Sequence, residues 1–217
     1  MPKTVLSEEL YQYAVDFGVR EHPVLTKLRN ETAKLSNRQM QISVDQGQLM
    51  GLLAKMIGAK RYLELGVFMG YSSLTMALAM GIDSHVTGLE LRTEHLKTAR
   101  EFWIEANVEK QIRVIEGPAT SSCAKLIADK EQFDIAFIDA NKTDYPTYYE
   151  YCYQLVKVGG LILVDNVLFK GAVLEEKPSN SALAIKKLNE IIKNDPRVDI
   201  CMLPIADGLT IAYKKGA

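Results

Sequence analysis

One stretch, residues 61–81, constrains the fold more than any other part of the chain. Its sequence, RYLELGVFMGYSSLTMALAMG, predicts a short apolar strand, a turn with two glycines, and a helix that Ser72 caps and Gly81 ends. A strand that leads into a helix through a glycine turn is the first half of a βαβ unit. Because ligands of open α/β sheets bind at the carboxyl ends of the strands, we expect a site between Glu64 and Ser72.

The spacing of the two glycines, Gly66 and Gly70, narrows the class of ligand. The order G-x-G-x-x-G, which lets a backbone approach a pyrophosphate closely, is missing. A dinucleotide is therefore disfavoured, and a nucleoside without phosphates is the better candidate. The alternative is that the two glycines only form a tight turn.

Size and composition predict a single domain spanning residues 1–217. A chain of 217 residues with 47% hydrophobic content can bury a substantial core, and we expect residues 43–217 to form it, with residues 1–42 as a helical appendage or lid. The net charge of −1 gives no basic stripe, so DNA is not an expected partner, although a local RNA contact stays open. Three cysteines without a C-x-x-C pair, no signal-like N-terminus and no membrane-length apolar run predict a cytoplasmic protein without a membrane partner.

Strand and helix patterns alternate along the chain. Helices are predicted near 7–18 and 23–35, after a capping box at 43–46, and over 92–107, 119–127, 145–156 and 182–193; further strands are predicted over 85–89, 111–115, 133–138 and 161–164. We expect the glycines at 159 and 160 to close the helix of 145–156. Segments 198–203 and 209–213 are joined by too few residues for a crossover helix, so they should form an antiparallel hairpin. The predicted fold is α/β, a doubly wound, Rossmann-like sheet of seven strands, mostly parallel, with a reversed C-terminal hairpin.

Acidic or amide side chains follow several predicted strands. Glu90 lies about 20 residues beyond the glycine turn, where an acid can accept hydrogen bonds from ribose hydroxyls. Asp139, Asp165 and Asn166 follow two later strands and offer only oxygen ligands, which suit Mg²⁺ or another hard cation. The alternatives are that Glu90 is a solvated loop acid and that Asp165 and Asn166 only form a turn after a strand.

Four ordered segments carry a resemblance to a known family: LELGVFMGYS (63–72), FIDANKTDY (137–145), LVKVGGLILVDNVLFKG (155–171) and CMLPIADGLTI (201–211). From residue 40 to the C-terminus the chain resembles the cation-dependent class I O-methyltransferases, the caffeoyl-CoA and catechol O-methyltransferase family. The resemblance implies a class I methyltransferase fold, S-adenosyl-L-methionine as cofactor, and Mg²⁺, or Mn²⁺ or Ca²⁺, holding a vicinal diol. It also implies a homodimer.

The resemblance assigns a role to individual residues. It makes Asp139, Asp165 and Asn166 the metal ligands, and Lys142 the general base beside Asp139. The alternative for Lys142 is an ordinary surface lysine that pairs with Asp144. The implied cofactor-binding residues are Met40, Ile42, Glu64, Gly66, Val67, Ser72, Glu90, Ala119 and Asp139.

Departures from the plant members of the family bear on the substrate. Asn141, Phe169 and Lys170 replace an acid, a tryptophan and a substrate-contacting asparagine, and the insertion of the plant enzymes before Phe133 is missing. A coenzyme A ester is therefore disfavoured, and the bacterial branch of the family fits better. The resemblance then implies methylation of a catechol-type small molecule. The alternatives are a tRNA 5-hydroxyuridine O-methyltransferase with the same site and, in another class, a non-catalytic nucleoside-binding domain.

Overall fold

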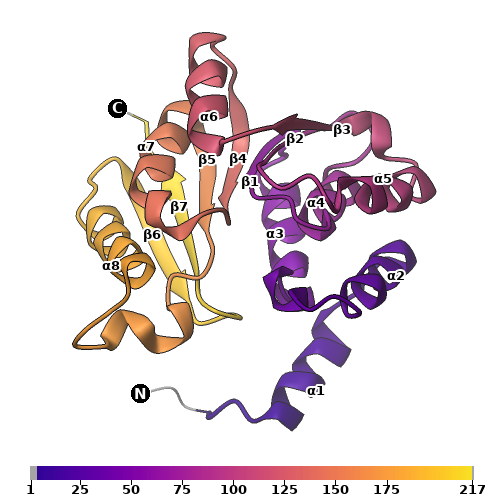
Figure 1. The fold of residues 1–217 in the computed structure, drawn as a ribbon, viewed down its shortest axis with the longest axis horizontal. Coiled ribbons are helices and arrows are strands. Elements are labelled where there is room, and N and C mark those ends of the chain that lie inside the picture. Colours follow the sequence, from indigo (N-terminus) through magenta and orange to yellow (C-terminus); the bar gives the residue numbers. More distant parts are fainter. Residues whose placement is uncertain (1–3, 217) are drawn as a thin grey trace.

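The computed structural model describes residues 4–216 and contains one seven-stranded sheet (Figure 1). The strand order is β3-β2-β1-β4-β5-β7-β6. Strands β1 to β5 are parallel, whereas β7 is antiparallel to both β5 and β6. The strands are β1 (Arg61–Leu65), β2 (His85–Glu90), β3 (Ile112–Glu116), β4 (Phe133–Ile138), β5 (Val156–Val164), β6 (Val198–Leu203) and β7 (Leu209–Lys214). The predicted doubly wound sheet with a reversed final hairpin is confirmed.

Helices cover both faces of the sheet, as Figure 1 shows. They are α1 (Glu8–Gly18), α2 (Pro23–Thr32), α3 (Val44–Met56), α4 (Tyr71–Met80), α5 (Leu96–Glu105), α6 (Ala119–Ala128), α7 (Tyr145–Leu155) and α8 (Asn180–Lys193), with short 3₁₀ helices η1 (Arg38–Met40), η2 (Glu109–Gln111), η3 (Lys142–Asp144) and η4 (Phe169–Leu174). Within residues 4–216, every helix falls short of the length and apolar content that crossing a membrane requires.

The core consists of two layers separated by the sheet. Side chains alternate across each strand, so Tyr62 of β1 packs with helices α2 to α5, whereas its neighbours Leu63 and Leu65 pack with α6, α7 and α8. Strand β4 is buried along its whole length, as expected for a central parallel strand covered on both faces. This arrangement leaves the carboxyl ends of β1, β2, β4 and β5 at one edge.

The two N-terminal helices differ in how they contact the core. Helix α1 begins after its N-cap, Ser7, whose Oγ accepts a hydrogen bond from the Leu10 N–H, and it buries no residue. It extends away from the sheet (Figure 1). Helix α2 ends at Thr32, three residues before the predicted end, and buries Val24, Leu25 and Leu28 against α4 and α5.

Three predicted details of local structure were wrong. Ser72 does not cap α4, because the helix begins at Tyr71 and its N-cap is Gly70, with a φ of 74°. Gly159 does not close α7 but lies within β5, since the helix ends at Leu155 and the strand begins at once. Only half of the capping box at α3 forms: the Ser43 Oγ accepts from the Gln46 N–H at 3.4 Å, whereas the Gln46 side chain is buried elsewhere.

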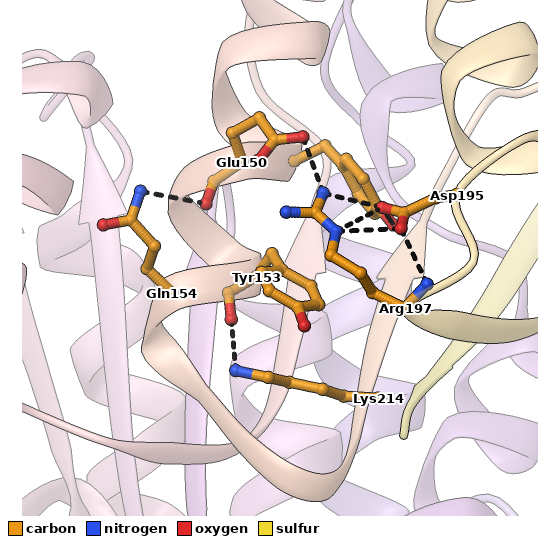
Figure 2. A network of polar contacts seen from close by, with 7 residues as sticks. Glu150, Tyr153, Gln154, Asp195, Arg197 and Lys214 are labelled. Atoms are coloured by element: carbon orange, nitrogen blue, oxygen red, sulfur yellow. Dashed lines mark hydrogen bonds and ion pairs between the residues drawn. The ribbon is translucent and has the colours of Figure 1, made fainter. Parts of the chain in front are cut away.

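A polar network fastens the C-terminal hairpin to α7 (Figure 2). The Arg197 guanidinium forms ion pairs with Asp195 at 2.7 Å and Glu150 at 2.9 Å, and it lies 3.9 Å from the centre of the Tyr153 ring. The Lys214 ammonium lies 4.3 Å from the same ring and donates a hydrogen bond to the Tyr153 carbonyl oxygen. The network lies at the end of the hairpin opposite the turn that joins β6 and β7. It therefore fixes the position of the hairpin relative to α7.

Candidate active site

The described residues enclose a cavity of about 730 Å³ at the carboxyl ends of the parallel strands. The strand order reverses between β1 and β4, which is where ligands of doubly wound sheets bind. Its size is that of a pocket for a cofactor together with a small substrate. The walls come from segments 37–46, 66–72, 89–95, 118–120, 139–148, 165–170 and 206–207.

The glycine turn after β1 forms part of the cavity wall. Gly66 has a φ of 94°, and a Cβ at this position would overlap the backbone oxygen of Asp139. The Asp139 N–H in turn donates to the Leu65 carbonyl at 2.9 Å. Glycine is therefore required at position 66 for β1 and β4 to bring their ends this close.

Glu90, at the end of β2, fixes the same turn. Its Oε2 accepts hydrogen bonds from the N–H groups of Val67 and Phe68, both at 2.8 Å, and its Oε1 accepts from the Arg92 N–H at 2.7 Å. The residue is 9% exposed and lines the cavity, so the alternative of a solvated loop acid is wrong. A carboxylate has further lone pairs, which leaves acceptor capacity for a ligand.

Glu64 lies behind the cavity wall rather than on it. It is fully buried and accepts hydrogen bonds from the Tyr62 hydroxyl at 3.3 Å and from the Ser73 hydroxyl. Burial raises the pKa of Glu64 to about 8, although the serine hydrogen bonds oppose this shift. A cation bound in the cavity, on the other side of this wall, would favour the ionised form of Glu64.

The three predicted metal ligands lie together. Ile138 and Val164 are register partners, and the Asp165 N–H donates to the Ile138 carbonyl at 3.1 Å, so Asp139 and Asp165 follow adjacent strand ends. Burial and then the charge of Asp139 raise the pKa of Asp165 to about 7. Asn166 comes next and lines the same cavity.

Asp165 is buried beside the carboxylate of Asp139, which is itself ion-paired with Lys142, and a cation between the two acids would offset their repulsion. Residues 4–216 contain no group of three or more His, Cys, Asp or Glu side chains placed to hold a metal ion, and the predicted set has two carboxylates and one amide. The backbone at Asn166 has a φ of 57°, which is uncommon for a residue other than glycine. Oxygen donors in this number suit a hard divalent cation whose remaining ligands are water or substrate.

Gln46 supports the same interpretation and was missed as a site residue. Its side chain is fully buried on the cavity wall facing Asp165, yet neither its Oε1 nor its Nε2 has a hydrogen bond of good geometry to any of residues 4–216. Buried amides are almost always paired, so this one points to a group that binds here. Its place in the predicted capping box was the only sequence signal at this position, and that signal assigned the side chain to the helix end rather than to the cavity.

Lys142 contacts a predicted metal ligand rather than the surface acid Asp144. Its Nζ donates to Asp139 Oδ1 and to the Tyr145 hydroxyl, both at 2.7 Å, and its side chain is 20% exposed. The Tyr145 hydroxyl in turn donates to the Ile138 carbonyl at 3.3 Å. Tyr145 was also missed, although its position three residues after Lys142 gives helical spacing.

The remaining predicted residues lie around the cavity. Met40 and Ile42 come from the segment before α3, and Ala119 begins α6 on the opposite wall. Phe169 and Lys170 lie at the rim with φ angles of 45° and 52°. Of the predicted cofactor residues, the cavity wall therefore includes Met40, Ile42, Gly66, Val67, Ser72, Glu90, Ala119 and Asp139, and leaves out Glu64.

The sheet order, the reversed hairpin and a cavity built around a glycine turn define the class I methyltransferase fold. A family model described as O-methyltransferase matches residues 15–215. The catechol O-methyltransferase domain-containing protein 1 of Mus musculus is 40% identical over 208 residues, covering 94% of this chain and 79% of that protein. Caffeoyl-CoA O-methyltransferase 2 of Zea mays is 39% identical over 220 residues, covering 96% and 83%.

A solved structure agrees with these relatives. The O-methyltransferase TomG from Streptomyces achromogenes, in complex with S-adenosylmethionine, is 28% identical with a TM-score of 0.85, covering 96% of each chain. The chain therefore belongs to the O-methyltransferase family, and S-adenosylmethionine-dependent methyl transfer to an oxygen is its enzymatic activity. The resemblance stated from the sequence is confirmed.

Proposed function

We propose that the enzyme methylates one hydroxyl of a vicinal diol in a catechol-type small molecule and needs a divalent cation to do so. The observation that carries this proposal is the meeting of Asp139, Asp165 and Asn166 in one cavity with the glycine turn after β1. A diol oxygen held beside these three residues can face a methyl group held beside the glycine turn. Alignment of two bound reactants supplies a large part of the rate of such transfers.

The cofactor takes the half of the cavity near the glycine turn. Glu90 and Ala119 both line this part of the cavity; the Glu90 carboxylate would accept hydrogen bonds from the ribose, and Ala119 would border the adenine. Met40 and Ile42, in the segment before α3, would cover the cofactor. Glu64, behind the wall, contributes its charge rather than a direct contact.

Asp139, Asp165 and Asn166 would hold the cation, Mg²⁺ or alternatively Mn²⁺ or Ca²⁺. When bound it lowers the pKa of the hydroxyl that it contacts. Asp139 and Asp165 would offset its charge, and Lys142, whose Nζ lies 2.7 Å from Asp139 Oδ1, is the residue that would take the hydroxyl proton. Tyr145 holds the Lys142 amine beside Asp139 through the 2.7 Å contact.

The alternative substrate is a 5-hydroxyuridine in tRNA. Besides Lys142, the basic side chains of Arg92 and Lys170 line the cavity and favour an acceptor with an anionic group nearby. Glu94 and Asp144 line it as well and disfavour a polyanion. The small diol is therefore the better candidate.

One assay tests both substrates and the cation. The enzyme is incubated with methyl-labelled S-adenosylmethionine and either a panel of catechols or bulk tRNA, with Mg²⁺ or with a chelator. We expect methylated catechol only in the presence of the cation. Undiminished methylation in chelator would contradict the role of the metal, and label in tRNA alone would favour the alternative.

We also propose that the enzyme is a homodimer in the cytoplasm. Helix α1 and the residues before it expose a set of apolar side chains, which favours burial against a second copy. The set is Val5, Leu6, Leu10, Tyr13 and Phe17. Free Cys123, Cys152 and Cys201 support a reducing compartment.

A further inference from the structure

Two loops meet beside the three oxygen ligands, and Asp207 joins them. The first loop follows β5 and includes Asn166 and Lys170; the second connects β6 to β7 and includes Asp207. The Asp207 Oδ1 accepts from the Lys170 N–H at 2.5 Å, and its Oδ2 accepts from the Asn166 Nδ2 at 3.3 Å. Its backbone oxygen accepts from the Leu168 N–H at 3.0 Å. One residue thus contacts three points of the loop after β5.

The loop that Asp207 contacts has an unusual backbone. Asn166, Phe169 and Lys170 all have φ angles between 45° and 57°, a region that residues with a Cβ rarely occupy and that costs free energy at each position. Close packing holds the loops together, because Gly208 has a φ of 89° and a Cβ there would lie 2.5 Å from the Leu168 Cγ. The conformation of Asn166 therefore depends on its contacts with the second loop.

The contact with Asp207 also selects the direction of the Asn166 amide. An asparagine amide has one end that donates and one that accepts, whereas a carboxylate only accepts. Because Asp207 takes the Nδ2 end, the Oδ1 end of Asn166 is left for the cavity. Groups that orient a ligand in this way commonly change metal affinity 10–100-fold when they are replaced.

We propose that Asp207 is a positioning residue that presents the Asn166 oxygen to the cation. The inference rests on the cation site of the proposed function and adds a residue to it. Asp207 acts through Asn166 and is not a ligand itself. Asparagine at position 207 could donate to the Asn166 oxygen as readily as accept from its nitrogen, so it would no longer select the direction of the amide.

A double-mutant cycle separates orientation from other effects of Asp207. Asp207→Asn is measured in the wild-type background and in the Asn166→Asp background, where the carboxylate at 166 presents an oxygen in either direction. Saturable Mn²⁺ binding is followed for the full chain through the electron paramagnetic resonance signal of free Mn²⁺. We expect Asp207→Asn to weaken Mn²⁺ binding about tenfold in the wild-type background and not at all in the Asn166→Asp background.

An equal loss in both backgrounds would overturn the inference, since loss of charge or of loop contacts acts regardless of the residue at 166. Asp207→Ser, whose hydroxyl both donates and accepts, is measured in parallel and should give the same pattern. S-adenosylmethionine affinity, unchanged in every variant, reports that the fold is intact. Asp199→Asn is the matched control on the same hairpin, since Asp199 pairs with Lys215 and lies off the cavity wall. Absence of saturable Mn²⁺ binding by the wild-type enzyme would instead overturn the cation site itself.

Discussion

At the scale of single residues, the site depends on charged and polar side chains whose burial changes their chemistry. Glu64 is held fully buried with a raised pKa, Gln46 is buried without a hydrogen bond of good geometry to any of residues 4–216, and Lys142 contacts both Asp139 and Tyr145. The first two arrangements cost stability in the free enzyme and favour a bound ligand, whereas the contacts of Lys142 fix the position of its amine. Substitutions at these positions should therefore separate stability from function.

Glu64 should make the stability of the free enzyme fall with rising pH. Its pKa is raised in the folded state to about 8 from a value of 4.5, so its contribution is fully present below about pH 4.5 and is lost as pH rises through 8. The slope is at most about 1.4 kcal/mol per pH unit. Urea unfolding of the wild type and of Glu64→Gln, measured from pH 5 to 8.5, checks this. If the amide mimics the neutral acid, the difference in unfolding free energy between the two proteins should shrink toward zero as the pH falls. A difference that does not vary with pH would contradict the shift.

Replacing Gln46 should stabilise the free enzyme and weaken cation binding. Gln46→Met keeps the approximate volume and removes an amide without partners, which should raise the free energy of unfolding by about 1–3 kcal/mol. The same change should lower Mg²⁺ affinity, because the amide faces Asp165. Thermal unfolding and calorimetric titration measure the two effects. Gln48→Met, also on α3, is the contrast: its Oε1 accepts from the Arg20 N–H at 3.1 Å, so this change should destabilise the enzyme. A destabilised Gln46→Met would show that the Gln46 amide is likewise satisfied.

Lys142 should affect turnover more than cofactor binding. Lys142→Ala removes the proposed base and should lower kcat by about 10²–10⁴-fold, with the affinity for S-adenosylmethionine nearly unchanged. Tyr145→Phe keeps the ring and loses the hydroxyl contact, so a smaller reduction of kcat is expected. Steady-state kinetics and calorimetry make the comparison. A parallel loss of cofactor affinity in Lys142→Ala would assign it a structural role.

At the scale of elements, the sequence predicted most of the strands and helices because their signals are local. The hairpin of β6 and β7 was inferred from a short linker, and the parallel core from the apolar run of residues 161–164 in β5. The errors fell where tertiary contacts override local preference. Gly159 lies in a strand rather than at a helix end, since β5 extends to meet its neighbours, and Gly70 rather than Ser72 precedes α4.

The hairpin network predicts a loss of stability without a loss of activity. Arg197→Met removes the ion pairs with Glu150 and Asp195 and the contact with the Tyr153 ring. These contacts lie off the cavity wall, at the opposite end of the sheet. Because Arg197 is 40% exposed, we expect a cost of only about 1 kcal/mol. Chemical denaturation measures it, with Lys193→Met as an exposed control. A reduced kcat in Arg197→Met would show that the network reaches the site.

At the scale of the whole molecule, one cavity is assembled from seven separate segments of the chain. The cofactor half depends on the turn after β1, and the acceptor half depends on the ends of β4 and β5 and on the loop between β6 and β7. Helix α1 lies outside this assembly and buries no residue in the single chain. Its apolar side chains are therefore available for the proposed dimer.

Deleting residues 1–18 should leave the fold intact and prevent dimer formation. Helix α1 buries nothing and is joined to the rest mainly by the Tyr11 hydroxyl, which donates to Asp45 at 3.0 Å. The thermal unfolding temperature at low protein concentration should change little. Sedimentation equilibrium of the full and shortened chains tests this, with Tyr11→Phe as the control for the single contact. A shortened chain that remains dimeric would contradict a role for α1.

The sequence by itself determined the order of strands and helices, the reversed hairpin and the family, because periodicity, turn residues and ordered motifs are written in neighbouring positions. It also predicted that Asp139, Asp165 and Asn166 would lie at one edge of the sheet, since the ends of parallel strands meet there, and the three line one cavity. Only the tertiary structure decided that Gln46 is buried beside Asp165, that Glu64 lies behind the wall and that Asp207 contacts Asn166. The last pair is 41 residues apart, and such contacts depend on how loops pack, which local sequence patterns do not encode.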